Sequence, residues 1–150
     1  MRVLVLHSDV APDAPPDELD TLLTARAIAQ ALHELGHEPR LAPFAPDPAA
    51  LKTLAGNADV VFNMVESVYG EGALAGIAPA MLEKLGVPYT GANAATISAT
   101  GNKPLAKRMM RAANLPTPDW SERPGFIGLI EDKKYIVKSA TEDASLGLTD

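Results

Sequence analysis

Short apolar segments alternate with helical patterns along the first part of the chain, and this alternation restricts the fold more than any other feature. Residues 2–7 and 58–64 are strongly apolar and, with the shorter segment 38–42, predict three strands. Two helices are predicted between them, one ending at Gly36 and one over 48–55. A β-α-β-α-β order implies parallel pairing through right-handed crossovers. We therefore predict an α/β fold, a Rossmann-like domain with a parallel sheet.

A helix that ends at a glycine and leads into a strand occurs again at the end of this first domain. A third helix is predicted over 73–85, followed by Gly86 and a short strand over 87–89. A glycine after the last apolar position supplies the left-handed residue that often ends a helix. We predict that residues 1–92 form one α/β domain.

After this point the pattern changes. Asn93 is expected to open a short helix, and Asn102 a second helix that ends near Asn114. Two strands are predicted further on, over 126–130 and 135–138, joined by a charged turn. Residues 93–150 are therefore predicted to be the start of a second, incomplete domain.

Composition excludes several classes of function. The chain has 150 residues, a net charge of −6 and no cysteine, so a basic nucleic-acid surface, a disulfide framework and thiolate metal sites are not expected. The apolar run after Met1 is too short for a signal-peptide core or a membrane span. We expect a cytoplasmic protein that binds neither nucleic acid nor a membrane.

Lys103 is the first candidate for chemistry. It lies at the predicted start of a helix, with Pro104 in the first turn. A cation there opposes the helix dipole, so either the lysine is a solvated surface residue or an anion compensates both. A nucleotide phosphate would do so, although the Walker A spacing is absent.

Lys138 is the second candidate. It follows an apolar run and precedes a small polar loop that extends to Gly147. Backbone amides and hydroxyls in such a loop can surround a phosphate. An ordinary strand end followed by a polar turn explains the same residues, and the pattern alone leaves both interpretations open.

The third candidate is the loop after the strand over 58–64. Ligands of parallel sheets bind at the carboxyl ends of strands, which makes Asn63 and Glu66 candidate ligands. Glu66 and Glu71 are equally explained as carboxylates at a helix start, where the dipole favours them. The glycines of this loop do not form a dinucleotide fingerprint.

Together these segments resemble the D-alanine–D-alanine ligase family of ATP-grasp enzymes. The resemblance extends over nearly the whole chain and is strongest from Asp59 to Gly147. The segments that carry it are Leu85-Gly86-Val87-Pro88-Tyr89-Thr90-Gly91, Asn102-Lys103-Pro104-Leu105-Ala106-Lys107, Ala112-Ala113-Asn114-Leu115-Pro116-Thr117-Pro118 and Val137-Lys138 with the loop to Gly147. In this family the first domain is a pre-ATP-grasp domain, and 93–150 would begin the central, ATP-binding part of the ATP-grasp domain.

The resemblance implies roles for particular residues. Lys103 and Lys138 match the two family lysines that contact ATP. Glu142, Ser145 and Gly147 stand in the small loop that covers the phosphates. ATP binding is therefore expected at these five residues.

The sequence also departs from the family pattern. Ala144 replaces the first of two adjacent serines, and Val65 with Glu66 stands where the family has a histidine. The acidic residue expected early in the first helix is represented by Glu18 or Asp20, which makes both candidates for substrate binding. The nucleotide part is better retained than the amino-acid part, so a substrate pair other than two D-alanines is expected.

The resemblance implies an ATP-dependent carboxylate–amine ligase that works through an acylphosphate. ATP and Mg²⁺ are the expected cofactors, and the metal ligands are expected beyond residue 150. The partners would be an amino-acid or small peptide-like substrate, with a second copy of the chain in a homodimer as a further candidate. We expect the 150-residue form to be inactive alone, with residues 116–150 poorly stable or associated with another chain.

A different class of protein also fits the residues. A non-catalytic α/β module that binds a small ligand or a protein partner would have the same first domain. It predicts that residues 1–92 fold alone and bind a small anion at the strand ends.

Overall fold

The computed structural model describes residues 1–11, 13, 14, 16–122 and 132–142, with the side chains of residues 16–18 left out of that description. In chain order the elements are β1 (Arg2–His7), α1 (Pro16–Glu34), β2 (Glu38–Pro43), α2 (Pro48–Ala55), β3 (Val60–Met64), the 3₁₀ turn η1 (Gly72–Leu74), α3 (Ile77–Leu85), α4 (Ala94–Gly101) and α5 (Lys103–Ala112). The β-α-β-α-β order predicted for the first part of the chain is confirmed.

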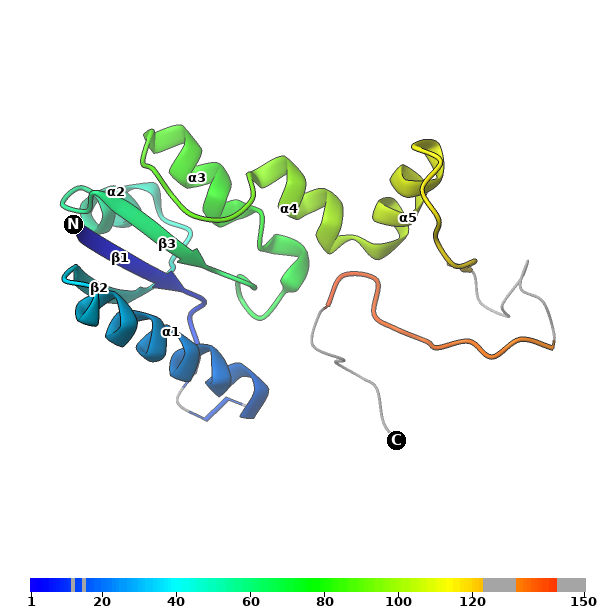
Figure 1. Cartoon of the computed structure of the whole chain (residues 1–150), viewed down its shortest axis with the longest axis horizontal. Coiled ribbons are helices and arrows are strands. Elements are labelled where there is room, and N and C mark those ends of the chain that lie inside the picture. Colours follow the sequence, from blue (N-terminus) through cyan, green and yellow to red (C-terminus); the bar gives the residue numbers. More distant parts are fainter. Residues whose placement is uncertain (12, 15, 123–131, 143–150) are drawn as a thin grey trace.

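The three strands form one parallel sheet in the order β2-β1-β3 (Figure 1). β1 lies in the centre, with Val5 opposite Leu41 on one side and Phe62 on the other. Because the chain runs from β1 to β2 and then crosses to β3, the strand order reverses between β1 and β3. In open α/β sheets this reversal is where ligands bind, at the carboxyl ends of the strands.

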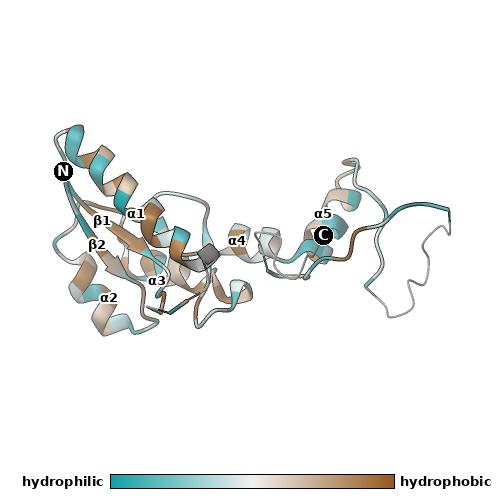
Figure 2. Ribbon diagram, turned by 90° about the horizontal axis from the view of Figure 1, so that it is seen from below, coloured by the Kyte–Doolittle hydropathy of each residue, from teal (hydrophilic) through white to brown (hydrophobic). Residues whose placement is uncertain are grey.

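Helices cover both faces of the sheet. α1 lies on the face of Val5, where Ala25 is buried against it. α2 and α3 lie on the opposite face, where Leu6 packs in one cluster with Leu51 and Leu82. Figure 2 shows hydrophobic colouring on β1, and both hydrophobic and hydrophilic stretches on the adjoining helices α1 and α2. Successive side chains of β1 thus pack into apolar layers on opposite faces of the sheet, as expected for a buried parallel strand.

Helix ends follow the local signals in the sequence. Gly36 and Gly86 both have positive φ angles, 80° and 67°, and Gly86 caps α3 in the left-handed conformation. At helix starts, the side chain of Asn93 accepts a hydrogen bond from Thr96 N and that of Asn102 accepts one from Leu105 N, at 2.8 and 2.9 Å. These side chains replace the hydrogen-bond partners that the first turn of a helix lacks.

The helix predicted over 73–85 is interrupted. The structure has η1 over 72–74 and begins α3 only at Ile77, with Gly76 as its N-cap. Apolar spacing is similar in a 3₁₀ turn and an α-helix, so periodicity does not reveal the break. Gly76, which favours a helix end over a helix interior, is the residue at which it occurs.

The strand predicted over 87–89 is reduced to a single parallel bridge between Val61 and Tyr89. Val61 N donates to Pro88 O at 2.8 Å, and Thr90 N donates to Val61 O at 2.9 Å. Proline has no N–H to donate, which limits how far this ladder can extend. The segment still lies beside β3, as predicted.

The strand predicted over 135–138 is wrong: the structure has an irregular, exposed segment there. A strand forms only where a neighbouring strand accepts and donates its backbone hydrogen bonds. Its predicted partner, 126–130, lies outside the described residues. Within the described part of the chain, no strand runs beside 135–138.

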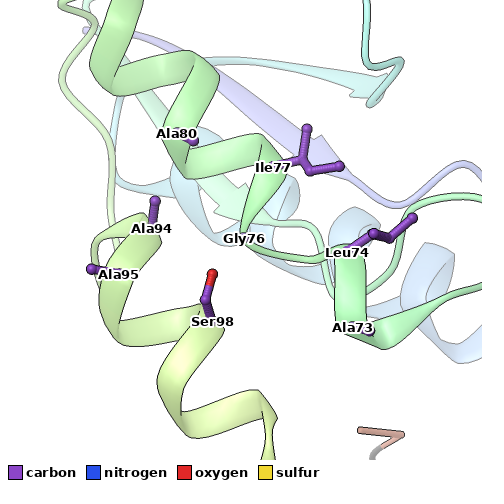
Figure 3. Close-up of a pocket in the computed structure, with 8 residues that line it drawn as sticks. All are labelled: Ala73, Leu74, Gly76, Ile77, Ala80, Ala94, Ala95 and Ser98. Carbon is purple, nitrogen blue, oxygen red and sulfur yellow. The ribbon is translucent and has the colours of Figure 1, made fainter.

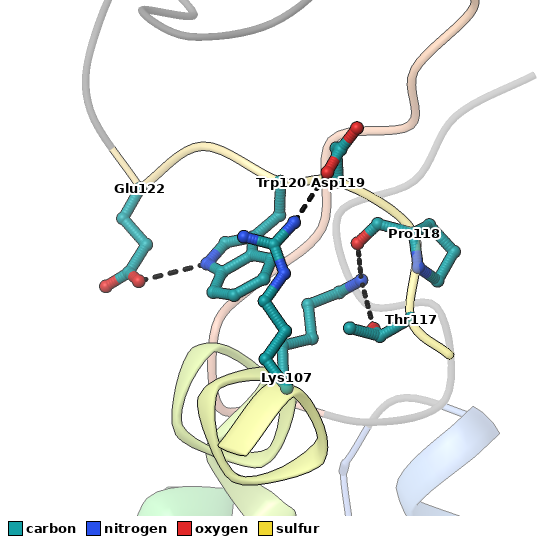
Figure 4. Close-up of polar contacts among 7 residues, drawn as sticks. Lys107, Thr117, Pro118, Asp119, Trp120 and Glu122 are labelled. Carbon is teal, nitrogen blue, oxygen red and sulfur yellow. Dashed lines mark hydrogen bonds and ion pairs between the residues drawn. The ribbon is translucent and has the colours of Figure 1, made fainter. Parts of the chain in front are cut away.

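The segment after α5 folds back onto that helix through its side chains (Figure 4). The Trp120 ring lies under two cations, 5.4 Å from Lys107 Nζ and 4.4 Å from Arg111 Cζ. Lys107 also donates to Thr117 Oγ1 at 3.1 Å, and Arg111 pairs with Asp119 at 2.5 Å. Cation–π contacts and ion pairs, and not burial of an apolar face, thus hold 117–120 against α5.

Candidate functional site

The carboxyl ends of β1 and β3 are joined by hydrogen bonds to Ser8. Its buried hydroxyl oxygen accepts from Glu66 N at 3.0 Å and from Ser67 N at 3.1 Å. Buried His7, at the end of β1, has Nδ1 2.8 Å from Ser8 O. The loop after β3 is therefore fixed against the end of β1, at the place where the strand order reverses.

Asn63 contributes to the fold of this loop. Its side-chain Oδ1 accepts from Val65 N at 3.3 Å, and its backbone N–H donates to Thr90 Oγ1 at 3.2 Å. The Glu66 side chain is exposed while its N–H is held by Ser8. Asn63 thus lies at the strand end as predicted, with its amide oxygen engaged locally.

A tight turn carries the chain from this loop to η1. Val68 and Glu71 form an antiparallel bridge, with Tyr69 and Gly70 between them at positive φ angles of 56° and 75°. Tyr69 is 81% exposed. The turn places the N–H of Gly72 at the surface that faces the second half of the chain.

Lys103 meets the segment 139–142 at that surface. Lys103 N donates to Ala140 O at 2.9 Å, and its ammonium Nζ donates to Glu142 O at 2.5 Å. The Glu142 carboxylate in turn accepts from Gly72 N, at 3.3 Å to Oε1 and 3.2 Å to Oε2. The start of α5, the start of η1 and the segment after Lys138 are thus brought together, as the orange-red segment in Figure 1 shows.

The remaining predicted site residues are placed less closely. The Lys138 side chain is exposed, and Lys138 directly precedes the segment 139–142. Asp20 lies exposed on α1, and Glu18 lies on the same helix with its side chain outside the described residues. Ser145 and Gly147 lie outside the described residues altogether. That Lys103 and Lys138 share one triphosphate remains a prediction.

Two residues of the site, Ser8 and Ser139, make contacts that were not predicted from the sequence. Ser8 is the first residue after β1, and a polar residue there could have been weighed as Asn63 was. Ser139 Oγ accepts from Thr141 N at 3.4 Å and from Glu142 N at 3.1 Å, which turns the chain toward Lys103. Serine directly after a strand-like run is a known turn former, and this is the signal that could have found it.

Electrostatic effects are clearest where α3 meets α4. Hydrogen bonds from Ala94 N at 2.9 Å and from the Tyr89 hydroxyl at 2.7 Å lower the pKa of Glu83. The hydrogen bond between the Tyr89 hydroxyl and Glu83 also raises the pKa of Tyr89. These contacts tie the start of α4 to the end of α3.

A shallow hollow separates these helices on the side of η1 (Figure 3). Its walls are small or aliphatic, formed by Leu74, Ile77, Ala80, Ala94 and Ser98 together with neighbouring residues. No charged side chain lines it, so it offers no cation to pair with a phosphate or a carboxylate. The hollow is better explained as an imperfect seam between helices.

Metal and membrane features were also sought in the described part of the chain. Residues 1–11, 13, 14, 16–122 and 132–142 contain no group of three or more His, Asp or Glu side chains placed to hold a metal ion. Among the same residues, no helix has the length and apolar character needed to cross a membrane.

Comparison with known proteins extends the resemblance. No protein-family model matches the chain. The D-alanine–D-alanine ligase of Aquifex aeolicus is 33% identical over 99% of this chain, and that of Desulfovibrio desulfuricans is 34% identical over 99%. This chain is a homologue of the D-alanine–D-alanine ligases. The predicted relationship is confirmed.

These matches cover 50% and 47% of the two ligases, so the chain spans about half the length of the curated relatives it matches. An uncharacterized protein of Sinorhizobium fredii, y4sG, is 33% identical over 89% of this chain and 42% of its own length. Among solved structures, the D-alanine–D-alanine ligase of Bacillus anthracis complexed with ATP matches with a TM-score of 0.63 at 22% identity, over 81% of this chain and 37% of that chain. The predicted α/β fold class is thus confirmed.

Proposed function

We propose that this chain forms part of an ATP-dependent carboxylate–amine ligase. In the proposed reaction a substrate carboxylate attacks the γ-phosphate of ATP to give an acylphosphate, and an amine then displaces phosphate. The protein contributes by holding the reactants in place and by stabilising the charge that develops on the phosphoryl oxygens. Homology to D-alanine–D-alanine ligases over nearly the whole chain supports the proposal.

The observation that carries the proposal is the meeting of Lys103 with the segment that follows Lys138. An ammonium at the start of a helix opposes the helix dipole, and a bound anion relieves this. The Lys103 ammonium donates to Glu142 O, and the carboxylate of the same residue accepts from the N–H of Gly72. Charge and placement therefore fit a phosphate at this surface.

We propose that the second substrate region is the carboxyl end of β1 and β3. Asn63 and Glu66 lie there, on a loop held by Ser8. Glu18 and Asp20 on α1 remain candidates from the sequence. An exposed carboxylate such as Glu66 suits the ammonium group of an amino acid, which is the substrate class that we propose.

ATP and Mg²⁺ are the proposed cofactors. The metal would neutralise phosphate charge, and it prefers carboxylate or amide oxygens with several retained waters. We propose that its ligands lie beyond residue 150. On this basis we also propose that the 150-residue chain is inactive alone. From its net charge of −6 and the short apolar run after Met1, we propose that it is cytoplasmic and binds neither nucleic acid nor a membrane.

Nucleotide binding by the 150-residue chain tests the central part of this proposal. Equilibrium dialysis with a non-hydrolysable ATP analogue is expected to show saturable binding that Lys103→Ala and Lys138→Ala each weaken about tenfold or more, since each removes a charged hydrogen-bond donor. Lys134→Ala is the matched control, because Lys134 is an exposed lysine of the same segment. Equal affinity in the wild type and both test variants would refute the nucleotide site.

Turnover is a separate measurement. Phosphate release from ATP is expected to stay at background with amino acids present. Release that depends on an amino acid and disappears in Lys138→Ala would overturn the proposed inactivity of this form. Light scattering on the same sample would decide between a monomer and the homodimer that we propose as a candidate state.

A further inference from the structure

The Glu142 carboxylate bonds to the protein's own backbone. Both of its oxygens accept from the N–H of Gly72, at 3.3 and 3.2 Å, across a separation of 70 residues. Glu142 is half-buried. The Gly72 N–H is shared between the two oxygens at distances longer than the shortest charge-assisted bonds, and the negative charge of the acceptor strengthens the contact relative to a neutral one.

The contact requires close approach at Gly72. A Cβ atom added there would lie 2.8 Å from Glu142 Oε2, closer than real Cβ contacts, and 3.0 Å from Thr141 O, a distance at which the neighbouring atom has to shift. The second of these atoms is backbone and cannot rotate away. Gly72 and the segment 141–142 are therefore matched to each other in shape.

Further bonds hold the same segment on Lys103. Ala140 O accepts from Lys103 N at 2.9 Å, and Glu142 O accepts from Lys103 Nζ at 2.5 Å. Within the segment, Ser139 Oγ accepts from Glu142 N at 3.1 Å. Glu142 thus touches Gly72 with its side chain and Lys103 with its carbonyl, and it is the one residue that bridges the two among these contacts.

We propose that Glu142 is a positioning residue, which holds segment 139–142 against Gly72 and thereby fixes the place of the Lys103 ammonium. An ammonium has three N–H donors, so the bond to Glu142 O orients the group and leaves its charge in place. The consequence for nucleotide binding rests on the proposed function. The tether itself does not, because it is a contact within the protein.

Limited trypsin digestion without nucleotide tests the tether. Cleavage after Lys138 requires segment 139–142 to leave Gly72, whereas cleavage after Lys133 or Lys134 does not. When opening is fast, the cleavage rate follows the population of the open form. Glu142→Ala is expected to raise the rate at Lys138 about tenfold relative to Lys133 and Lys134, in line with the loss of a charged hydrogen bond.

Three variants sharpen this result. Glu142→Gln keeps an acceptor oxygen and is expected to restore most of the protection at Lys138. Gly72→Ala, which crowds Thr141 O, is expected to expose Lys138 as Glu142→Ala does. Glu71→Ala removes an exposed neighbouring carboxylate and is expected to behave as wild type. Peptides of residues 132–142, with and without the substitution, correct for trypsin's own preference.

The Lys103 ammonium provides a second readout. In ¹⁵N-lysine-labelled protein, the Lys103 Nζ resonance, assigned with Lys103→Arg, is expected to exchange slowly with water in the wild type and Glu142→Gln and quickly in Glu142→Ala. Unchanged cleavage and an unchanged Lys103 signal in Glu142→Ala would overturn the tether. Both expected changes without any binding of the ATP analogue would uphold the tether and refute the nucleotide site.

Discussion

Leu82→Ala tests whether the first part of the chain is the unit that folds. Leu82 lies on α3, has no exposed surface, and packs in one cluster with Leu4, Leu6 and Val61. Among the described residues, the buried members of the two core clusters run from Leu4 to Leu82. The cavity left by this substitution should therefore act on the proposed domain 1–92 and on nothing after it.

The expected cost follows from leucine-to-alanine changes in other cores. Such changes cost about 2.7–5.0 kcal/mol, the larger values where the surroundings cannot collapse. Leu82 lies within one turn of the end of α3, where the helix can shift toward the cavity, so we expect a value near the lower end of this range, about 3 kcal/mol. For a domain of this size that would lower the midpoint of thermal unfolding by at least ~12 °C.

Urea unfolding followed by far-UV circular dichroism measures this cost in the 150-residue chain and in residues 1–92. The shorter chain loses α4 and the bond from Ala94 N to Glu83, so its own stability is expected to be lower. The loss caused by Leu82→Ala should nevertheless be equal in both chains. Leu35→Ala is the control, because Leu35 is 73% exposed and its truncation should change stability by less than about 0.5 kcal/mol. A failure of residues 1–92 to fold, or a loss below about 1 kcal/mol for Leu82→Ala, would refute the reasoning.

Two further predictions concern the helices that follow. Glu83→Ala is expected to lower the midpoint of thermal unfolding at neutral pH. Hydrogen bonds from Ala94 N and the Tyr89 hydroxyl hold the pKa of Glu83 in the folded protein below its ordinary value of 4.5. The difference between variant and wild type should therefore persist above pH 4.5 and vanish as the pH falls through the lowered pKa, which unfolding midpoints measured across pH will check. Arg111→Ala is expected to increase quenching of Trp120, the single tryptophan of the chain, by the neutral quencher acrylamide, since one cation that covers its ring is removed. A quenching constant equal to that of wild type would contradict the stacking.

Elements whose signals are local could be predicted from the sequence. Asn93 and Asn102 cap α4 and α5 with their own side chains, and Gly86 ends α3 in the conformation that glycine favours. Each of these signals acts within a few residues of the helix end that it determines. Strands β1 and β3 were predictable for a related reason, because their sequences are mostly apolar, as is typical of buried parallel strands. β2 is a largely exposed edge strand, and its position between two predicted helices indicated it more than its composition did.

Elements that depend on a distant partner could not be predicted in the same way. Apolar residues over 135–138 indicated a strand, but the spacing of side chains cannot supply the neighbouring strand that completes its hydrogen bonds. The break at Gly76 also escaped, since η1 and α3 share one apolar spacing. At the site, Lys103 and Glu142 were recognised by resemblance as candidates, yet the bond of the Glu142 carboxylate to Gly72 had no signal in either local sequence.

The two long-range contacts of Glu142 strengthen each other. Gly72 and Glu142 are 70 residues apart, and Lys103 and Glu142 are 39 apart. Closing the longer loop instead of the shorter costs only about 0.5 kcal/mol more, because the entropy of closure grows with the logarithm of length. Once Lys103 holds Glu142, the bond between Glu142 and Gly72 has to close only the loop between residues 72 and 103. The loop-closure entropy lost on forming this second bond is therefore smaller. Loss of either contact should therefore weaken the other. For this reason Glu142→Ala, which removes the side chain that contacts Gly72, is expected to speed the exchange of the Lys103 ammonium with water.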